Sequence, residues 1–300
     1  MTDTSRSISV AVIGGGMFFD DIIGQSFKDL IRGGIAGSLT SIGMSHLAAD
    51  VADIKIELCA VGTRSESSGT AGRIVEWFAG EFPDRQIEAC YGETVWNDII
   101  DRHRPDVLFV ATPDHLHTDP ILAALEAGCD VIAEKPLCLT CEEADQIIAR
   151  ARQQDRIVAV DMHKRYDPFV RDMMLNSEEK YGTINRVRTV LEEPLEVSTE
   201  IFAWAEESNP FTYVGCHWLD VVHHYLGVKP RSVFATGQKN LLVNWDEHHL
   251  EVARRQGVDP STFKRRHAIQ TWDSIDVAVT YDNGRRGDYS NNWINPAEFE

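Results

Sequence analysis

Residues Val10–Gly16 read Val-Ala-Val-Ile-Gly-Gly-Gly, and this stretch decides the fold of the first half of the chain. A short apolar run bounded by turn residues predicts a buried β-strand. The glycines permit a tight turn, and a helical pattern begins directly after them. Backbone amides at the start of such a helix can hold a pyrophosphate. The predicted phosphate-binding residues are therefore Gly14, Gly16, Met17 and Phe18.

This dinucleotide-binding signature departs from the usual pattern in two places. Phe19 occupies the position of the third glycine. The second predicted strand ends in Thr63-Arg64-Ser65, without the acidic residue that usually holds the ribose 2′-hydroxyl of NAD. Arg64 and Ser65 would instead suit the 2′-phosphate of NADP, although Arg64 could also be an ordinary surface arginine. The predicted cofactor is NADP or NAD, with NADP slightly favoured, and Thr63, Arg64 and Ser65 are its expected ribose contacts.

Outward from this turn, short apolar runs alternate with helical patterns, which predicts βαβ units and a parallel sheet. The expected strands are Ser9–Ile13, Ile56–Val61, Ile87–Cys90, Val107–Ala111, Val131–Ala133 and Ile157–Val160. Two helix starts are marked, one by Asp119 before Pro120 and one by the capping box Thr140–Glu143. Residues 33–53 look like an insertion in the first crossover.

The texture changes after about residue 160, so we expect two domains, a Rossmann dinucleotide-binding domain over 1–160 and a sheet domain over 161–300. Strand patterns occur at Asn185–Leu191, Ser232–Gly237, Ile275–Thr280 and Arg286–Tyr289. The last two flank Asp282-Asn283-Gly284, a hairpin signal. The only strong helical pattern before residue 246 spans Cys216–Leu226. The fold class is thus α/β, followed by an α+β domain with an open-faced, mainly antiparallel sheet.

Composition excludes several classes of function. The 300 residues carry a formal net charge of −18, which argues against a nucleic-acid-binding surface and an anionic membrane surface. No apolar run reaches the roughly 18 residues of a membrane span, and no signal peptide is visible. Six cysteines in a chain of this length do not form a disulfide framework, so a cytoplasmic location is expected. Cys138 and Cys141 have no second pair for a zinc site, and no metal is predicted.

A second informative stretch is Val131–Pro136, a buried strand that runs into Glu134-Lys135-Pro136. Pro136 keeps Lys135 extended, so an ammonium group is expected at the mouth of the sheet. The alternative is a surface lysine whose charged end reaches solvent. On the helix near residue 217, His217, Asp220 and His224 share one face. Such a stripe could orient an imidazole as a base, hold a histidine structurally, or bind a metal.

Several motifs together resemble the glucose–fructose oxidoreductase and inositol dehydrogenase family, Gfo/Idh/MocA. They are Gly14–Gly16, Ala111–His117 (Ala-Thr-Pro-Asp-His-Leu-His), Glu134–Pro136, His163–Tyr166 (His-Lys-Arg-Tyr) and Gly215–Asp220 (Gly-Cys-His-Trp-Leu-Asp). The resemblance implies a nicotinamide-dependent oxidoreductase for sugars, cyclitols or related small molecules. It also implies a homodimer or homotetramer joined through the C-terminal sheets.

The resemblance assigns roles to individual residues. The nicotinamide side of the cofactor would contact Thr112, Pro113, His115, His117, Glu134, Lys135 and Arg165. Lys135 would stabilise the developing alkoxide, and His217, oriented by Asp220, would take or return the hydroxyl proton. Family members place an aspartate four residues before the histidine, where this chain has Tyr213, a potential proton relay.

Hydride transfer between nicotinamide and a carbinol or carbonyl carbon is the expected reaction. Two alternatives are an NAD-dependent glycoside hydrolase that uses transient oxidation, and a non-catalytic dinucleotide sensor. The sequence ends without a closing helix, so the second sheet is expected to have an unpaired late edge, as in a shortened variant or a fragment.

Overall fold

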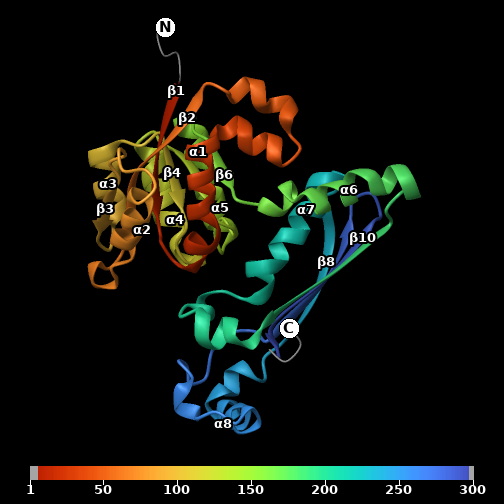
Figure 1. The fold of residues 1–300 in the computed structure, drawn as a ribbon. Coiled ribbons are helices and arrows are strands. Elements are labelled where there is room, and N and C mark those ends of the chain that lie inside the picture. The colour runs from red at the N-terminus through yellow and green to blue at the C-terminus, as the bar shows by residue number, and fades with distance from the viewer. Residues whose placement is uncertain (1–5, 297–300) are drawn as a thin grey trace. The chain divides into compact units, whose positions relative to one another are not determined.

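The computed structural model of the chain describes residues 6–296. Contacts divide the chain into two compact units, Met1–Asp161 and Met162–Glu300, and each unit contains its own sheet (Figure 1). Among the described residues, no helix has the length and apolar character needed to cross a membrane.

The first unit is built on a six-stranded sheet with the strand order β3-β2-β1-β4-β5-β6. Every neighbouring pair in this sheet is parallel. The strands are β1 (Arg6–Ile13), β2 (Ile54–Thr63), β3 (Glu88–Tyr91), β4 (Val107–Val110), β5 (Asp130–Ala133) and β6 (Val158–Val160). This is the order of a dinucleotide-binding doubly wound sheet, in which the ligand crevice opens at the carboxyl ends of the strands near the β1–β4 switch point. The predicted Rossmann fold is confirmed.

Helices cover both faces of this sheet. One face packs against α1 (Gly24–Ser41) and α2 (Thr70–Ala79) through a cluster that includes Phe19, Phe27, Ile74 and Phe78. The other face packs against α3 (Val95–His103), α4 (Thr118–Glu126) and α5 (Cys141–Gln154). Its core contains Ile99, Leu108, Ile121, Leu125 and Ile147. Strands buried on both faces explain the near-continuous apolar runs of β1 and β4.

The helix starts agree with the sequence in one case and differ in the other. Thr140 caps α5, with both bonds of the predicted capping box to Glu143 present. Helix α4 begins at Thr118, so Asp119 lies in its first turn and is not the cap. Pro120 is tolerated there because the first-turn amides have no partner within the helix.

Residues 33–53 form helical structure at the margin of the first unit. Helix α1 changes direction at Gly34, whose φ of 70° and ψ of 168° are not helical. A 3₁₀ helix follows at Ser45–Val51 and has no buried residue. Figure 1 shows these stretches in orange, extending beyond the sheet. The segment therefore adds surface to the domain and little to its core.

The second unit contains a four-stranded mixed sheet in the order β7-β10-β9-β8. Its strands are β7 (Arg186–Pro194), β8 (Pro230–Gln238), β9 (Ser274–Tyr281) and β10 (Arg286–Asn295). The β8–β9 and β9–β10 pairs are antiparallel, and β10 runs parallel to β7. The predicted hairpin is confirmed, with the Gly284 amide donating to the Tyr281 carbonyl.

Helix α7 (Cys216–Leu226) has the predicted bounds and covers one face of this sheet. Val222 of α7 shares a core cluster with Val277, Val279 and Tyr289 of the strands. A separate cluster surrounds Trp245, the first residue of α8 (Trp245–Gln256), and includes the strand residue Trp293.

Helix α6 (Pro168–Tyr181) was not predicted as a strong helix. Its sequence has no clear apolar stripe, and Met174 is its one buried residue. Its start was nevertheless marked, because Asp167 caps the helix and Pro168 occupies the first position.

Candidate active site

The glycine turn after β1 is shaped for a close approach of backbone. Gly14 has a φ of +106°, and a Cβ there would lie 2.2 Å from the Ala111 carbonyl oxygen of the segment after β4. A Cβ at Gly16 would have no atom within 4 Å, so the turn is open on that side. The helical turn starts at once, with the Phe19 amide donating to the Gly16 carbonyl at 3.0 Å. Open space beside a helix start fits a dinucleotide pyrophosphate.

Phe19, at the third glycine position, is buried in the core between the sheet and α1 and α2. The backbone accommodates this large ring in a π-helical turn over Phe19–Ile23. The next close approach in this segment is at Gly24, where a Cβ would lie 2.6 Å from the Trp77 ring of α2. Before this turn, the predicted phosphate-site residue Met17 is 49% exposed, and Phe18 is half-buried.

The predicted ribose contacts lie at the end of β2. Thr63 closes the strand, and its hydroxyl oxygen is buried without a hydrogen-bond partner among the described residues. Arg64 and Ser65 are exposed, as the 2′-phosphate interpretation requires. Glu66, which was not predicted as a site residue, is an exposed acidic residue in the 3₁₀ turn that follows. This loop therefore offers both a cation and a carboxylate to a ribose.

The segment after β4 holds one histidine between the loops at the edge of the sheet. His117 is buried, with Nδ1 2.7 Å from the Pro136 carbonyl oxygen and Nε2 2.8 Å from that of Thr112. Its ring therefore connects the loops that follow β4 and β5. His115 is half-buried, and its Nδ1 has no hydrogen-bond partner within residues 6–296. His115 Nδ1 is itself buried, and it lacks the kind of carbonyl contact that both ring nitrogens of His117 make.

Glu134 and Lys135 follow β5 and are both buried, at 6% and 7% exposure. The surface-lysine alternative is therefore wrong. The Lys135 amide donates to Glu134 Oε2 at 3.3 Å. Burial and, after it, the neighbouring Asp161 raise the pKa of Glu134 to about 8, and Lys135 opposes both effects. A buried cation with a carboxyl beside it thus stands at the carboxyl edge of the sheet.

In the second unit, α7 and the 3₁₀ turn His163–Tyr166 bring four polar side chains together. Two guanidinium nitrogens of Arg165 donate to the two carboxylate oxygens of Asp220, and Nε lies 2.6 Å from Oδ2. This bond raises the pKa of Arg165. His217 is buried, and its ring centroid lies 4.6 Å from that of His163. His163 belongs to the family motif but was not predicted as a site residue; its place in that motif was the available signal.

Two other residues that the sequence singled out here, one just before α7 and one on it, have different surroundings. Tyr213 packs among aromatic rings, with centroids 4.8 Å from Phe202 and 6.0 Å from Trp293. His224 is exposed. Within residues 6–296, the one group of possible metal ligands with mutually close atoms is Glu88, Cys90 and His103. The metal alternative for the His217 stripe is therefore not supported, and Asp220 is engaged by Arg165.

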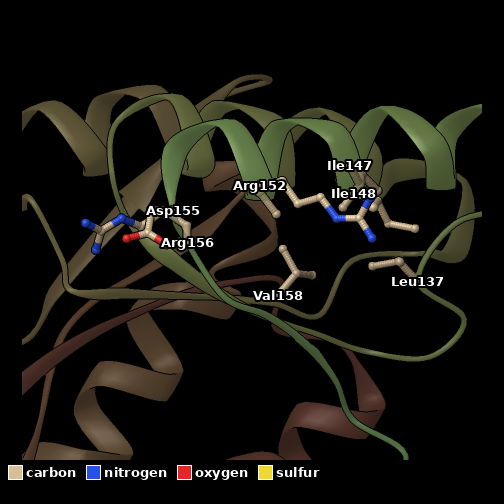
Figure 2. A pocket seen from close by; sticks show the side chains of 8 residues that line it. Leu137, Ile147, Ile148, Arg152, Asp155, Arg156 and Val158 are labelled. Carbon is tan, nitrogen blue, oxygen red and sulfur yellow. The ribbon is translucent and has the colours of Figure 1, made fainter.

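Two cavities of the first unit lie away from these residues. One of about 370 Å³ lies beside α5 and β6 and is lined by apolar residues such as Leu137, Ile148 and Val158. Figure 2 shows the Arg152 side chain extended along this hollow and Asp155 at its end. None of the predicted site residues lines it.

Models of known protein families match both units of the chain. The family model described as "Oxidoreductase family, NAD-binding Rossmann fold" matches residues 8–162. The chain belongs to the Gfo/Idh/MocA oxidoreductase family. The Gfo/Idh/MocA C-terminal domain model matches residues 174–300, so the family extends over the second unit as well.

Members of the Gfo/Idh/MocA family with sequence similarity include two bacterial dehydrogenases. D-glucoside 3-dehydrogenase of Escherichia coli (strain K12) is 29% identical over 46% of this chain and 41% of its own length. The NADP⁺-dependent scyllo-inositol 2-dehydrogenase IolW of Bacillus subtilis (strain 168) is 27% identical over 57% of this chain and 47% of its own length. The matched part of the chain thus spans less than half of each of these relatives.

A solved structure with the same fold is myo-inositol 2-dehydrogenase from Lactobacillus plantarum, with a TM-score of 0.66 and 17% identity. The similarity covers 97% of this chain and 71% of that one. At this level of identity, the comparison establishes the shared fold.

Proposed function

We propose that the chain catalyses reversible hydride transfer between the nicotinamide of NAD(P) and a carbinol or carbonyl carbon of a sugar or cyclitol. The observation that carries the proposal is the buried ammonium of Lys135 at the carboxyl end of β5, in a sheet whose first turn is open at Gly16. The nicotinamide accepts or donates the hydride when bound. Family relatives named as glucoside and inositol dehydrogenases support the substrate class.

The residues of the chain have separate roles in the proposed hydride transfer. Lys135 stabilises the negative charge that develops on the substrate oxygen, because a fixed cation in a dry site acts strongly. His217 takes or returns the hydroxyl proton, since a histidine ordinarily titrates near neutral pH. Asp220 positions α7 through its bond to Arg165. Tyr213 is a proposed relay toward His217. Gly14, Gly16, Met17 and Phe18 hold the pyrophosphate, and Thr112, Pro113, His115, Glu134 and Arg165 are proposed for the nicotinamide side.

The preferred cofactor and the assembly are further proposals. Arg64 and Ser65 favour NADP slightly, although Glu66 in the same loop would suit NAD. A homodimer or homotetramer through the second sheet is supported by β8, which is exposed along its whole length. A cytoplasmic location is supported by the six free cysteines.

The decisive experiment uses Lys135→Met with Lys180→Met, an exposed lysine of α6, as the control. Turnover is measured as nicotinamide absorbance across a panel of polyols and keto-sugars, with NAD and NADP supplied separately. We expect kcat of Lys135→Met to fall by about 100-fold or more while cofactor still binds. Normal turnover in this variant would remove Lys135 from the mechanism.

The same assay separates the alternative functions. A dehydrogenase changes the cofactor in proportion to product, whereas a glycoside hydrolase with transient oxidation shows no net change. A sensor binds dinucleotide but turns over no member of the panel.

A further inference from the structure

Two carboxyl groups meet at the carboxyl edge of the first sheet. Ala133 of β5 pairs with Val160 of β6, so the next residues, Glu134 and Asp161, leave neighbouring strands side by side. The Asp161 amide donates to the Ala133 carbonyl at 2.8 Å, which continues the pairing to the site. Glu134 is 6% exposed, and Asp161 is the neighbouring carboxylate whose charge acts on it.

The surroundings of this pair favour the protonated form of Glu134 near neutral pH. Burial and Asp161 together raise the pKa of Glu134 to about 8, and Lys135 lowers it. Glu134 Oε1 is buried and has no hydrogen-bond partner among the described residues. Two neighbouring carboxylates are costly to ionise together in a buried place.

Other titratable groups near the pair come from the segment after β4, the second neighbour of β5. They are Asp114, which is buried, His115, which is half-buried, and His117, whose two ring nitrogens each lie within 2.8 Å of a backbone carbonyl oxygen.

The pair lies on the nicotinamide half of the fold. In a sheet of this order, β1 to β3 carry one mononucleotide and β4 to β6 carry the other. The proposed function places the nicotinamide on the second half. An oxidised nicotinamide ring is positively charged and a reduced ring is neutral, so an adjacent carboxyl that titrates interacts differently with the two forms.

We propose that the Glu134–Asp161 carboxyl pair links the protonation of this site to the oxidation state of the bound nicotinamide. The oxidised cofactor binds best when the pair has lost its proton, and its binding releases that proton. The reduced cofactor binds with the proton retained. The inference rests on the proposed function, because it needs the nicotinamide at this edge of the sheet.

The test measures the dissociation constants of NAD⁺, NADH, NADP⁺ and NADPH on the full chain from about pH 7 to about pH 9.5, a range that spans the titration. We expect the ratio of the oxidised to the reduced constant to fall roughly tenfold as pH rises, which corresponds to a shift of about one pKa unit. Calorimetry in buffers with different ionisation enthalpies should show proton release for the oxidised form alone.

Two variants identify the groups responsible. Glu134→Gln should make the ratio independent of pH in this range, because the titrating carboxyl is gone. Asp161→Asn should move the change to lower pH, because the repulsion is removed. Asp145→Asn, an exposed carboxylate on α5, should behave like the native chain. Thermal unfolding confirms that each variant is folded, and Asp161→Asn alone suffices if Glu134→Gln does not fold.

The possible outcomes distinguish a failure of the proton linkage at Glu134 from a failure of the proposed function. Binding of a cofactor pair with a ratio that stays flat with pH overturns the inference and leaves the proposed function standing. A slope that survives Glu134→Gln also overturns it. Failure of all four dinucleotides to bind overturns both.

Discussion

Gly14 and Gly16 belong to one turn but have different surroundings, and this difference can be tested residue by residue. Gly14→Ala would combine a positive φ with a Cβ 2.2 Å from a carbonyl oxygen. We expect it to lower the free energy of unfolding by more than about 2 kcal/mol and to abolish cofactor binding. Gly16→Ala has open space, so the fold should be retained while the added methyl weakens cofactor binding. Thermal melts and dinucleotide titrations check both. Equal losses of stability would contradict the structure.

Glu134 also makes stability depend on pH. Its pKa is raised from 4.5 to about 8 on folding, so the folded state binds the proton more tightly than the unfolded state. Stability is therefore greatest below about pH 4.5 for this group and falls as pH rises through about 8. Glu134→Gln should remove this fall, with a gain of about 2–5 kcal/mol relative to the native chain at high pH. Urea unfolding near pH 5.5 and near pH 9 measures the difference, and parallel curves for the two chains would contradict it.

At the scale of elements, the bond between Arg165 and Asp220 fixes the start of the second unit to α7. Their side chains are 30% and 11% exposed, so Asp220→Asn would leave a partly buried guanidinium without its counter-charge. We expect the free energy of unfolding to fall by about 1–3 kcal/mol. The matched control is Asp288→Asn, which breaks the more exposed pair with Arg186 and should cost less than about 1 kcal/mol. Similar costs for the two substitutions would show that burial does not strengthen the first pair.

The elements that the sequence predicts are those with strong local signals. The apolar runs of β1 and β4, the capping box at Thr140 and the turn at Gly284 each depend on neighbours in the chain. Helix α6 lacks an apolar stripe and was missed. The parallel pairing of β10 with β7 joins residues about 100 positions apart, which no local pattern specifies.

Residues of the candidate site could be predicted where the local sequence fixes their position, as for the elements. Lys135 could be found because Pro136 and the apolar run before it fix its place at the end of a strand. The position of Glu134 beside Asp161 depends on the register of β5 and β6, and the contact of His217 with His163 depends on tertiary packing. Neither can be derived from spacing along the chain.

At the scale of the whole molecule, the second sheet leaves an apolar ring on its outermost strand. Phe234 of β8 is 71% exposed and is paired with Ala278 of β9, on the face opposite the α7 cluster. We expect Phe234→Glu to reduce the mass of the native oligomer, because a charge at a buried interface is costly. Light scattering after size-exclusion chromatography measures the mass. Lys239→Glu, just beyond the strand, tests whether charge alone has this effect. A monomeric native chain, or an unchanged mass in Phe234→Glu, would argue against assembly through this sheet.

The imidazole of His117, which joins the carbonyls of Thr112 and Pro136, has a consequence for ligand association. It connects the loops after β4 and β5, to which the proposed function assigns the nicotinamide, so the conformational entropy of these loops is lost when the domain folds rather than when a ligand binds. A dinucleotide should therefore meet a preorganised surface on this side, and its association rate should be limited by diffusion and orientation rather than by loop ordering.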